Sequence, residues 1–471
     1  MLVSKATRYA LVLVSLMIVG CNASPGSGSA SGGSGDGGNS GGGLQVGNGV
    51  IAGGGSGDAP NPGTGVGGGS NSSSAGGGSG GSGGGSGAVD GASAVTIDAN
   101  SGRDLEAFSG SAGDVSGAAI LSIDVSNSTA FQVITINGSD GSGGQAAVCS
   151  AARIDDSCMA TLSLTSPGGS TLLSSSTNSP PKTLALAVDT SVNSLNYRTQ
   201  SADPTVVDGT YQQRIAFAKL SQSFRGFVAA KNDTDLNNGA LRVNVFLVGA
   251  DAQRERTRSA VTQAIAIWRE IYKVSGRQII LDPVFIDLNS SSGILPNPIV
   301  GSSFYRDATS SSGIRAFSVS VFIGDDISQD GTTIGGNTFG PDVLGISAGI
   351  PGAAVSTVRT AVAVNLFAHA GADGILSNED IDILGETLAH EVGHYLGLFH
   401  PVECVGSGAD RCAVLGTGDS LADTASCGSL AACVANGLVD NVMFPTAVPG
   451  RRQRDMSTSQ LGVLNQNVLV D

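Results

Sequence analysis

The chain is poor in aromatic, charged and basic residues. Of its 471 residues, 4% are aromatic, 13% are charged, and only 4 are histidine. Its 24 Lys and Arg are outnumbered by 39 Asp and Glu, which gives a formal net charge of −15. Because binding to phosphate backbones needs clustered Lys and Arg, this composition argues against nucleic acid as a partner.

Glycine is the residue in excess, with 71 positions, most of them before residue 95. Residues 21–95 are rich in Gly and Ser and contain almost no large apolar residues. Such a segment cannot bury a core, so we predict a disordered tether there. The whole chain has room for two or three domains, but only roughly the last 375 residues can fold.

Residues 1–20 are typical of an export signal. Lys5 and Arg8 precede an apolar run over residues 9–19, which is shorter than the about 20 residues of a membrane-spanning helix. An ordinary cleaved signal peptide is one interpretation. The Gly20-Cys21 pair at the expected cleavage point favours a second one, a bacterial lipoprotein signal, because residues 18–21 resemble a lipobox.

The lipobox resemblance implies that Cys21 is lipidated and anchors the chain. Asn22 stands where an Asp commonly retains lipoproteins at the inner membrane. We therefore expect a cell-envelope location, as an outer-membrane lipoprotein facing the periplasm or the cell surface, or as a form released from it. Membrane contact is expected through this anchor only.

Six further cysteines remain, an even count that indicates disulfides in an exported chain. We predict that Cys149 pairs with Cys158. If these two were unpaired, one of them could act in latency. The last four cysteines are predicted to form two bridges, for which the sequence leaves three connectivities open: Cys404, Cys412, Cys427 and Cys433.

Residues 96–205 contain short β-prone runs separated by turn-rich segments. This pattern predicts a small all-β, sandwich-like domain. Its sequence shows no clustered His, Cys or carboxylate constellation, so we interpret it as an accessory domain or a pro-domain. Residues 206–240 are predicted to be a connector. The β-prone runs are 94–98, 119–125, 131–136, 160–164 and 183–188.

From residue 241 the pattern becomes α/β (α+β), and residues 241–471 predict a mixed twisted sheet with two long helices. The first helix is predicted over residues 252–274, with Gly276 ending it. The second begins at Ser377, which forms a capping-box-like start with Asp380. The apolar face of the first helix comprises Val261, Ala264, Ile265, Trp268, Ile271 and Tyr272. Strands are predicted at 241–248, 278–288, 317–323, 346–350 and 361–366.

The second helix contains the pattern HExxHxxGxxH over residues 390–400. His390 and His394 are four residues apart, so both imidazoles lie on one helical face and can reach one ion. Gly397 allows a sharp turn that returns His400 as a third ligand. Glu391 can reach a metal-bound water without being a ligand. Three protein ligands with an open fourth position are typical of a catalytic zinc site.

The motif resembles that of the metzincin zinc peptidases, in which a methionine-containing turn follows. Met443, within residues 440–445, matches that methionine, and the resemblance implies that it packs beneath the histidines without binding the metal. Nothing places His369, the fourth histidine, near the metal, and we interpret it as structural. Pro445 gives the turn a Met-x-Pro form similar to that of matrixins and adamalysins.

Within the metzincins the chain is most similar to pappalysin-like peptidases. Residues 418–424 resemble their GDxxxDT segment. Asp419 and Asp423 are therefore candidates for a Ca²⁺ site, and the alternative is that they cap turns. Pro445 is a departure, because pappalysins usually carry Tyr at that position, and this leaves the exact subfamily open.

The resemblance implies a zinc-dependent endopeptidase that cleaves extracellular or surface proteins, with Glu391 as general base and one catalytic Zn²⁺. Its target is either broad or narrow, such as one surface or matrix protein or a glycoprotein, and the sequence does not separate the two. The alternative from another class is a lipid-anchored adhesion protein, in which the β-rich domain binds a partner and the peptidase fold is latent. The intact Glu391 speaks against that alternative.

Overall fold

The structure, a computed structural model, describes residues 90–471 apart from several gaps. Residues 1–89, including Cys21 and most of the predicted tether, lie outside the described residues, as does the predicted Cys149–Cys158 pair. Every described residue belongs to one compact unit. In this part of the chain no helix is long and apolar enough to cross a membrane. The gaps are 101, 138–158, 175–183, 190–191, 198–204, 218–220, 236, 250, 289, 291, 298–302, 311–316, 328–332, 335–336, 339–342, 356–360, 371–374, 405–411, 414–418, 420 and 449.

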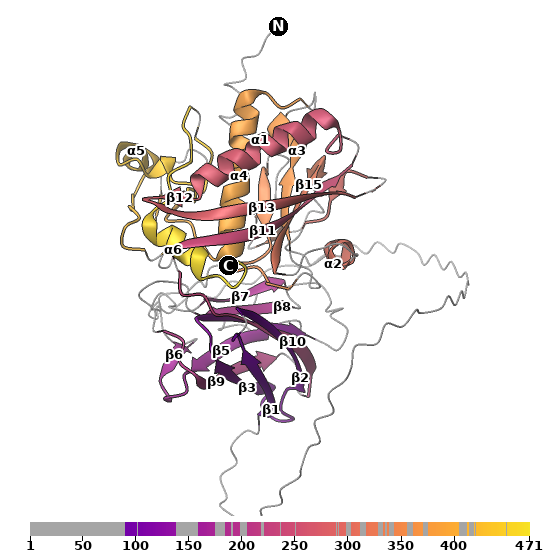
Figure 1. Ribbon diagram of the computed structural model, residues 1–471, viewed down its shortest axis with the longest axis vertical. Helices are drawn as coiled ribbons and strands as arrows, with labels where there is room; N and C mark the ends of the chain where they lie inside the picture. Colours follow the sequence, from indigo (N-terminus) through magenta and orange to yellow (C-terminus); the bar gives the residue numbers. More distant parts are fainter. Residues whose placement is uncertain are drawn as a thin grey trace, which may run out of the picture. The chain divides into compact units, whose positions relative to one another are not determined.

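Residues 90–231 form a β-rich part that contains two five-stranded sheets (Figure 1). The strand order is β1-β3-β9-β5-β6 in one sheet and β2-β10-β4-β8-β7 in the other. Strand β1 runs parallel to β3, and the other neighbours pair antiparallel. The strands are β1 (Gly91–Asp98), β2 (Arg103–Ser111), β3 (Ala118–Ser126), β4 (Ala130–Asn137), β5 (Met159–Thr165), β6 (Thr171–Ser174), β7 (Leu184–Asp189), β8 (Val192–Tyr197), β9 (Gly209–Phe217) and β10 (Ser223–Lys231).

Side chains from both sheets share one hydrophobic cluster, as a β-sandwich requires. Phe131 of β4 lies against Tyr211 of β9 in the other sheet, with ring centroids 5.1 Å apart. Phe217 of β9 stacks on Phe224 of β10 at 5.0 Å. The two-layer arrangement is the one that the sequence predicts for residues 96–205, but it extends further along the chain.

The structure differs from the prediction of a connector at 206–240. Strands β9 and β10 occupy much of that segment, and both lie in the interior of their sheets. Their sequences mix Gln, Arg and Gly with apolar residues, and buried Gln213 lies within β9. This weakens the period-2 alternation that identifies a strand. Strand β1 likewise begins at Gly91, inside the segment predicted as tether.

The α/β part, residues 238–471, is built on a six-stranded mixed sheet of order β12-β13-β11-β15-β20-β19. The strands β13, β11, β15 and β20 run parallel, whereas the edge strands β12 and β19 are antiparallel to their neighbours. This confirms the predicted mixed sheet. The strands are β11 (Asn238–Val248), β12 (Lys273–Val274), β13 (Arg277–Leu288), β15 (Ser318–Gly324), β19 (Gly345–Ser347) and β20 (Val362–Asn365).

Two long helices, α1 (Glu255–Ile271) and α4 (Asn378–Leu396), pack together and share one core cluster with the sheet (Figure 1). The predicted apolar face of α1 is buried, including Trp268 at 0% exposure. Gly276 does not end this helix. It lies with Ser275 in the turn between β12 and β13, and both residues have positive φ, as tight hairpin turns demand.

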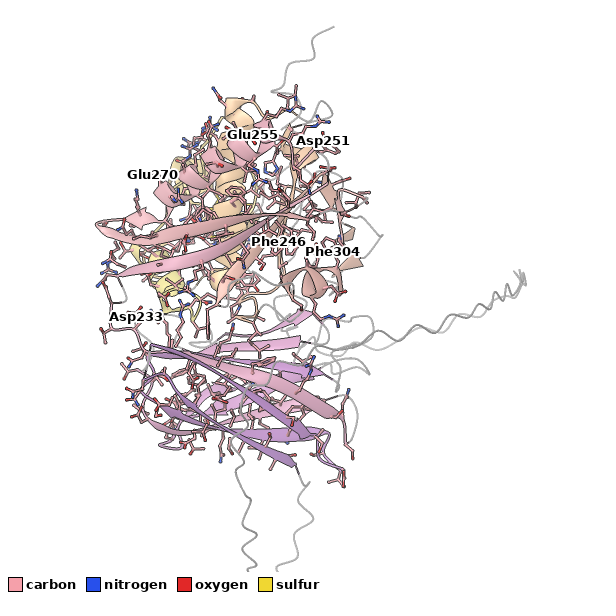
Figure 2. All side chains as sticks on the ribbon, turned by 45° about the vertical axis from the view of Figure 1, so that its right-hand side comes forward. Asp233, Phe246, Asp251, Glu255, Glu270 and Phe304 are labelled. Atoms are coloured by element: carbon pink, nitrogen blue, oxygen red, sulfur yellow. A yellow bond between two sulfur atoms is a disulfide. The ribbon has the colours of Figure 1, made fainter. Side chains whose placement is uncertain are left out.

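A second cluster includes the side chains of β11 and β15 that point away from the core shared with α1 and α4. Phe246 of β11 stacks on Phe322 of β15 with centroids 4.2 Å apart. Phe304 of helix α2 (Ser303–Thr309) packs on Phe322 at 5.9 Å, and Figure 2 labels Phe246 and Phe304. The short elements nearby are β14 (Ile294–Leu295), β16 (Asp326–Ile327), β17 (Thr333–Ile334), β18 (Asn337–Thr338) and α3 (Leu366–Ala370).

After α4 the chain forms small elements held by disulfides and short contacts. The structure pairs Cys404 with Cys412 and Cys427 with Cys433, which selects one of the three connectivities left open by the sequence. These bridges belong to a buried cluster with Phe444. The elements are β21 (Glu403–Cys404), β22 (Cys412–Ala413), α5 (Leu430–Ala435), the 3-10 helix η4 (Leu438–Asp440) and α6 (Thr458–Gln466).

The β-rich part contacts the α/β part through apolar and buried polar groups. Ala130 and Ile134 of β4 belong to the hydrophobic cluster of the α/β sheet and helices. The Lys231 ammonium, at the end of β10, is buried and donates to the carbonyls of Asn465 and Val470. The side chain of Gln132 of β4 accepts from the Ala354 N–H and donates to the Gly352 carbonyl, each at 2.8 Å. Removing the β-rich part would take these partners away from the Ala354 N–H and from the carbonyls of Asn465 and Val470.

Candidate metal centre

Helix α4 positions the first two histidines because both of its ends are fixed by local sequence. Ser377 and Asp380 form the predicted capping box at its start. At its end Gly397 has φ 118°, a conformation that L side chains rarely adopt. The Leu398 N–H bonds back to the Gly393 carbonyl at 2.9 Å, so the chain reverses direction over the face that carries the histidines.

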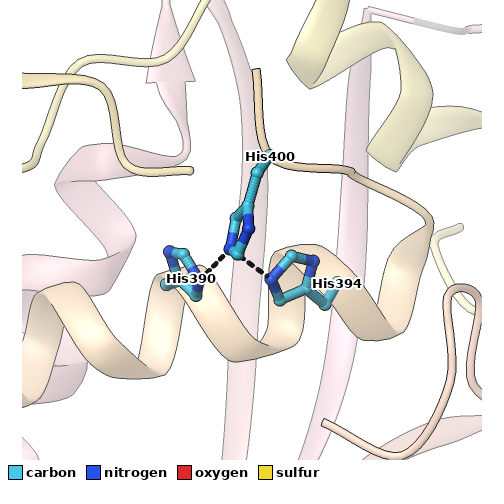
Figure 3. A group of neighbouring side chains, drawn as sticks. All are labelled: His390, His394 and His400. Atoms are coloured by element: carbon cyan, nitrogen blue, oxygen red, sulfur yellow. Dashed lines mark hydrogen bonds between the residues drawn. The ribbon is translucent and has the colours of Figure 1, made fainter. Parts of the chain in front are cut away.

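The three predicted ligands converge on one point (Figure 3). His390 and His394 project from α4, and His400 approaches from the segment after the turn. The Nε2 atom of His400 lies 3.0 Å from that of His394 and 3.1 Å from that of His390. Two zinc–nitrogen bonds of about 2.1 Å at a tetrahedral angle hold nitrogens about 3.4 Å apart. The spacing therefore fits one ion after a small expansion.

Each imidazole is oriented by its other nitrogen. The Nδ1 atom of His390 donates to the Val442 carbonyl, and that of His394 donates to the Leu398 carbonyl, both at 2.7 Å. The Nδ1 atom of His400 donates to the Glu403 carboxylate, also at 2.7 Å. These acceptors place the ring protons on Nδ1, so all three Nε2 lone pairs face one another.

Three converging lone pairs repel one another unless a cation lies between them. Burial, reinforced by His400, lowers the pKa of His390 to about 3. Burial and the two neighbouring rings hold the pKa of His394 well below its usual value. The rings of His390 and His394 are therefore neutral near pH 7, as metal ligands must be, and the donor set fits a divalent ion with imidazole preference such as Zn²⁺.

Glu391 is buried beside the histidines at 4% exposure, facing the edge strand β19. One carboxylate oxygen has no hydrogen-bond partner among the described residues. The Ser347 N–H bonds the carboxylate, and burial raises the pKa of Glu391 to about 8. A buried carboxylate with an unpaired oxygen, next to three histidine Nε2 lone pairs, can accept a proton from a water molecule bound between it and the histidines.

The turn containing Met443 lies beneath the histidine-bearing helix. Met443 is fully buried, and its sulfur lies so close to Gly393 that a Cβ there would be 2.8 Å from it. The preceding residue, Val442, supplies the carbonyl that orients His390. Met443 therefore packs against helix α4 at Gly393, and the same turn also has a polar role.

The remaining candidate residues have other environments. His369 is buried between the Asn365 carbonyl and the Thr387 hydroxyl, and burial lowers its pKa to about 4, in agreement with a structural role. Asp423 accepts from the Ser457 hydroxyl and the Ser459 N–H at the start of α6. Asp419 accepts from the Leu421 N–H. Both aspartates thus make the hydrogen bonds of turn caps, and neither belongs to a three-residue ligand cluster within the described residues. Their binding of Ca²⁺ stays a prediction.

Sequence reasoning missed three groups that shape this site: Glu403, the Val442 carbonyl and the Ser347 N–H. The last two are backbone atoms, for which a sequence carries no signal. Glu403 is different, because a carboxylate three residues after a metal-ligating histidine can be recognised as a hydrogen-bond acceptor for that histidine.

Comparisons with known proteins add little. No family model matches the chain, and no curated protein matches its sequence. Among solved structures, metalloproteinase-II from Bacteroides fragilis matches with a TM-score of 0.30 and 11% identity, over 51% of this chain and 62% of that one. A chaperone–substrate complex matches with a TM-score of 0.26 and 14% identity, over 50% of this chain and 36% of that one. Both matches span less than two thirds of the neighbour. The following proposal therefore rests on the site geometry and on the sequence motifs.

Proposed function

We propose that the protein is a zinc-dependent endopeptidase with a metzincin-type catalytic domain of pappalysin-like character. The observation that carries the proposal is the convergence of three imidazole Nε2 atoms next to Glu391, whose buried carboxylate has one oxygen without a partner among the described residues. Supporting features are the positive φ at Gly397 and the position of Met443 beneath the helix. A bundle of three histidines serving only to stabilise the fold would not need their lone pairs to converge.

His390, His394 and His400 would hold the ion, which supplies a Lewis acid and lowers the pKa of a bound water toward about 7. Glu391 takes a proton from the attacking water and passes it to the leaving amine. A cation held by the histidines would favour the ionised form of Glu391 and would oppose burial, which raises the pKa of this carboxyl. Burial keeps bulk water away from this proton transfer.

The substrate is proposed to extend along β19. This strand is one of the two edge strands of the six-stranded sheet and is antiparallel to β20. It spans only Gly345–Ser347, so it is shorter than the predicted 346–350 and begins one residue earlier. An extended peptide can add to such an edge through main-chain hydrogen bonds, which tolerate many side chains. Its Ser347 contacts Glu391, so a peptide on this edge passes close to the proton acceptor.

The proposed location of the enzyme rests on the sequence alone. We propose that it is held at the cell envelope by a lipid on Cys21 and acts on extracellular or surface proteins. The histidine site does not bear on this assignment.

A direct test uses the full chain and its Glu391→Ala variant. We expect one zinc per chain in both, measured by elemental analysis, and cleavage of a mixed peptide library only by the parent. Cleavage by Glu391→Ala at the parent rate would refute the role of Glu391. Zinc in both chains with cleavage by neither would instead favour the binding-protein alternative.

A further inference from the structure

We propose that Glu403 is a positioning residue for the metal centre: its carboxylate fixes the tautomer and orientation of His400 and thereby tightens the hold of the three histidines on a divalent metal. The inference rests on the proposed function only in that the histidine cluster binds a metal. It does not depend on peptidase activity.

The three imidazoles are supported unequally. His390 and His394 donate to neutral backbone carbonyls, whereas His400 donates to a carboxylate at the same 2.7 Å distance. Hydrogen bonds to ionised acceptors are roughly twice as strong as those to neutral ones. A carboxylate partner also raises the basicity of the opposite ring nitrogen. Glu403 therefore makes His400 a stronger ligand than its helical neighbours.

His400 is also the ligand that most needs such a partner. The other two histidines are fixed by helix α4, while His400 follows the turn at Gly397 and lies outside any helix or strand. Its side chain is completely buried, and that of Glu403 is 15% exposed. The pair is thus shielded from solvent, which would otherwise weaken a contact between a donor and an acid.

Glu403 is itself held by a closed hairpin. In the pairing of β21 with β22, Glu403 lies opposite Ala413, and Cys404 lies opposite Cys412. The Cys404–Cys412 disulfide closes this hairpin immediately next to Glu403. Both cysteines are buried in one cluster with Phe444, which lies two residues after the Val442 carbonyl that orients His390. The disulfide therefore restrains the residue that orients His400.

The decisive experiment measures metal binding without turnover. In the full chain carrying Glu391→Ala, we would compare Glu403→Gln with a matched control, Glu386→Gln. Glu386 is a buried carboxylate that accepts from Arg454 at 2.8 Å instead of from a histidine. Competition with a chromophoric chelator should give a zinc dissociation constant about tenfold higher for Glu403→Gln. The control should match the Glu391→Ala chain.

Thermal unfolding with and without zinc separates positioning from general stability. In excess chelator, the Glu403→Gln chain should have the same melting temperature as the Glu391→Ala chain. The increase in melting temperature on adding zinc should be smaller in the Glu403→Gln chain. Equal zinc affinities, or an equal loss of stability with and without zinc, would overturn the inference and leave the proposed function standing. Failure of the Glu391→Ala chain itself to bind zinc would overturn both.

A double-mutant cycle tests the role of the hairpin. Replacing both Cys404 and Cys412 by Ser should weaken zinc binding in a chain with Glu403. The same replacement should add little in a chain with Glu403→Gln, because the disulfide acts through that carboxylate. Additive losses would refute this coupling.

Discussion

Gly345→Ala tests whether Glu391 must be held in place by the edge strand. Strand β19 passes so close to α4 that a Cβ on Gly345 would lie 2.8 Å from Cγ and 3.3 Å from Cδ of Glu391. It would also lie 3.0 Å from Cγ2 of Thr387. Ordinary contacts between carbon atoms are about 3.5–4.0 Å. The distance between the added methyl group and Cγ of Glu391 must therefore increase by about 1 Å.

The side chain of Glu391 can move away from the added methyl group more easily than the backbone of β19 or α4 can. Gly345 is paired with Val364 of β20, and α4 is packed in the core, so neither backbone can retreat easily. A displacement of about 1 Å in a reacting group can cost about a hundredfold in rate. Because Gly345 contacts none of the three histidines among its nearest neighbours, zinc content should not change.

The assay is kcat on a peptide substrate together with zinc per chain, for Gly345→Ala and for Gly428→Ala. Gly428 is a control because a Cβ there meets nothing within 4 Å. We expect a large fall in kcat for the first variant and none for the second, with full zinc in both. A folded, zinc-loaded Gly345→Ala enzyme with the parent kcat would show that the position of Glu391 relative to β19 does not limit the reaction.

Three further predictions concern stability and metal binding. Burial lowers the pKa of Lys231 to about 8, against 10.5 for an exposed lysine. Between pH 8 and pH 10.5 the unfolded chain binds more protons than the folded chain, so the free energy of unfolding should rise with pH by up to about 3 kcal/mol. Urea unfolding of the parent and of Lys231→Met at pH 7 and pH 10 should show this rise in the parent only. Gly397→Ala should cost about 1–2 kcal/mol through its positive φ and weaken zinc binding by displacing His400, as calorimetry and chelator competition would show. A chelator should lower the melting temperature of the parent but not that of His394→Ala, because only the former gains stability from bound metal.

The metal centre could be predicted from the sequence because its geometry is local. His390, Glu391 and His394 occupy one helix, and Gly397 has the left-handed backbone needed to return His400. The supporting groups were harder to predict. The Val442 carbonyl is a backbone atom 52 residues from His390, so only the folded chain brings them together.

The β-rich part was predictable as a class but not in extent. Strands β1, β3, β4, β5 and β7 overlap the predicted β-prone runs, whereas β2, β6, β8, β9 and β10 were not predicted. β2 is largely polar and partly exposed, as suits an edge strand, and it shows little alternation. The contacts of Lys231 and Gln132 with the α/β part also have no sequence signature, because their partners are backbone atoms more than 200 residues away.

The acceptors that orient the three histidines also set an order of events during folding. Leu398 and Glu403 lie within four residues of their histidines, so those two hydrogen bonds can form early. The bond from His390 to Val442 closes a loop of 52 residues and must await the docking of the Met443 turn. An incompletely folded chain would therefore offer one ring of undefined tautomer and retain metal poorly. Under the proposed assignment, metal capture would itself report that folding is complete.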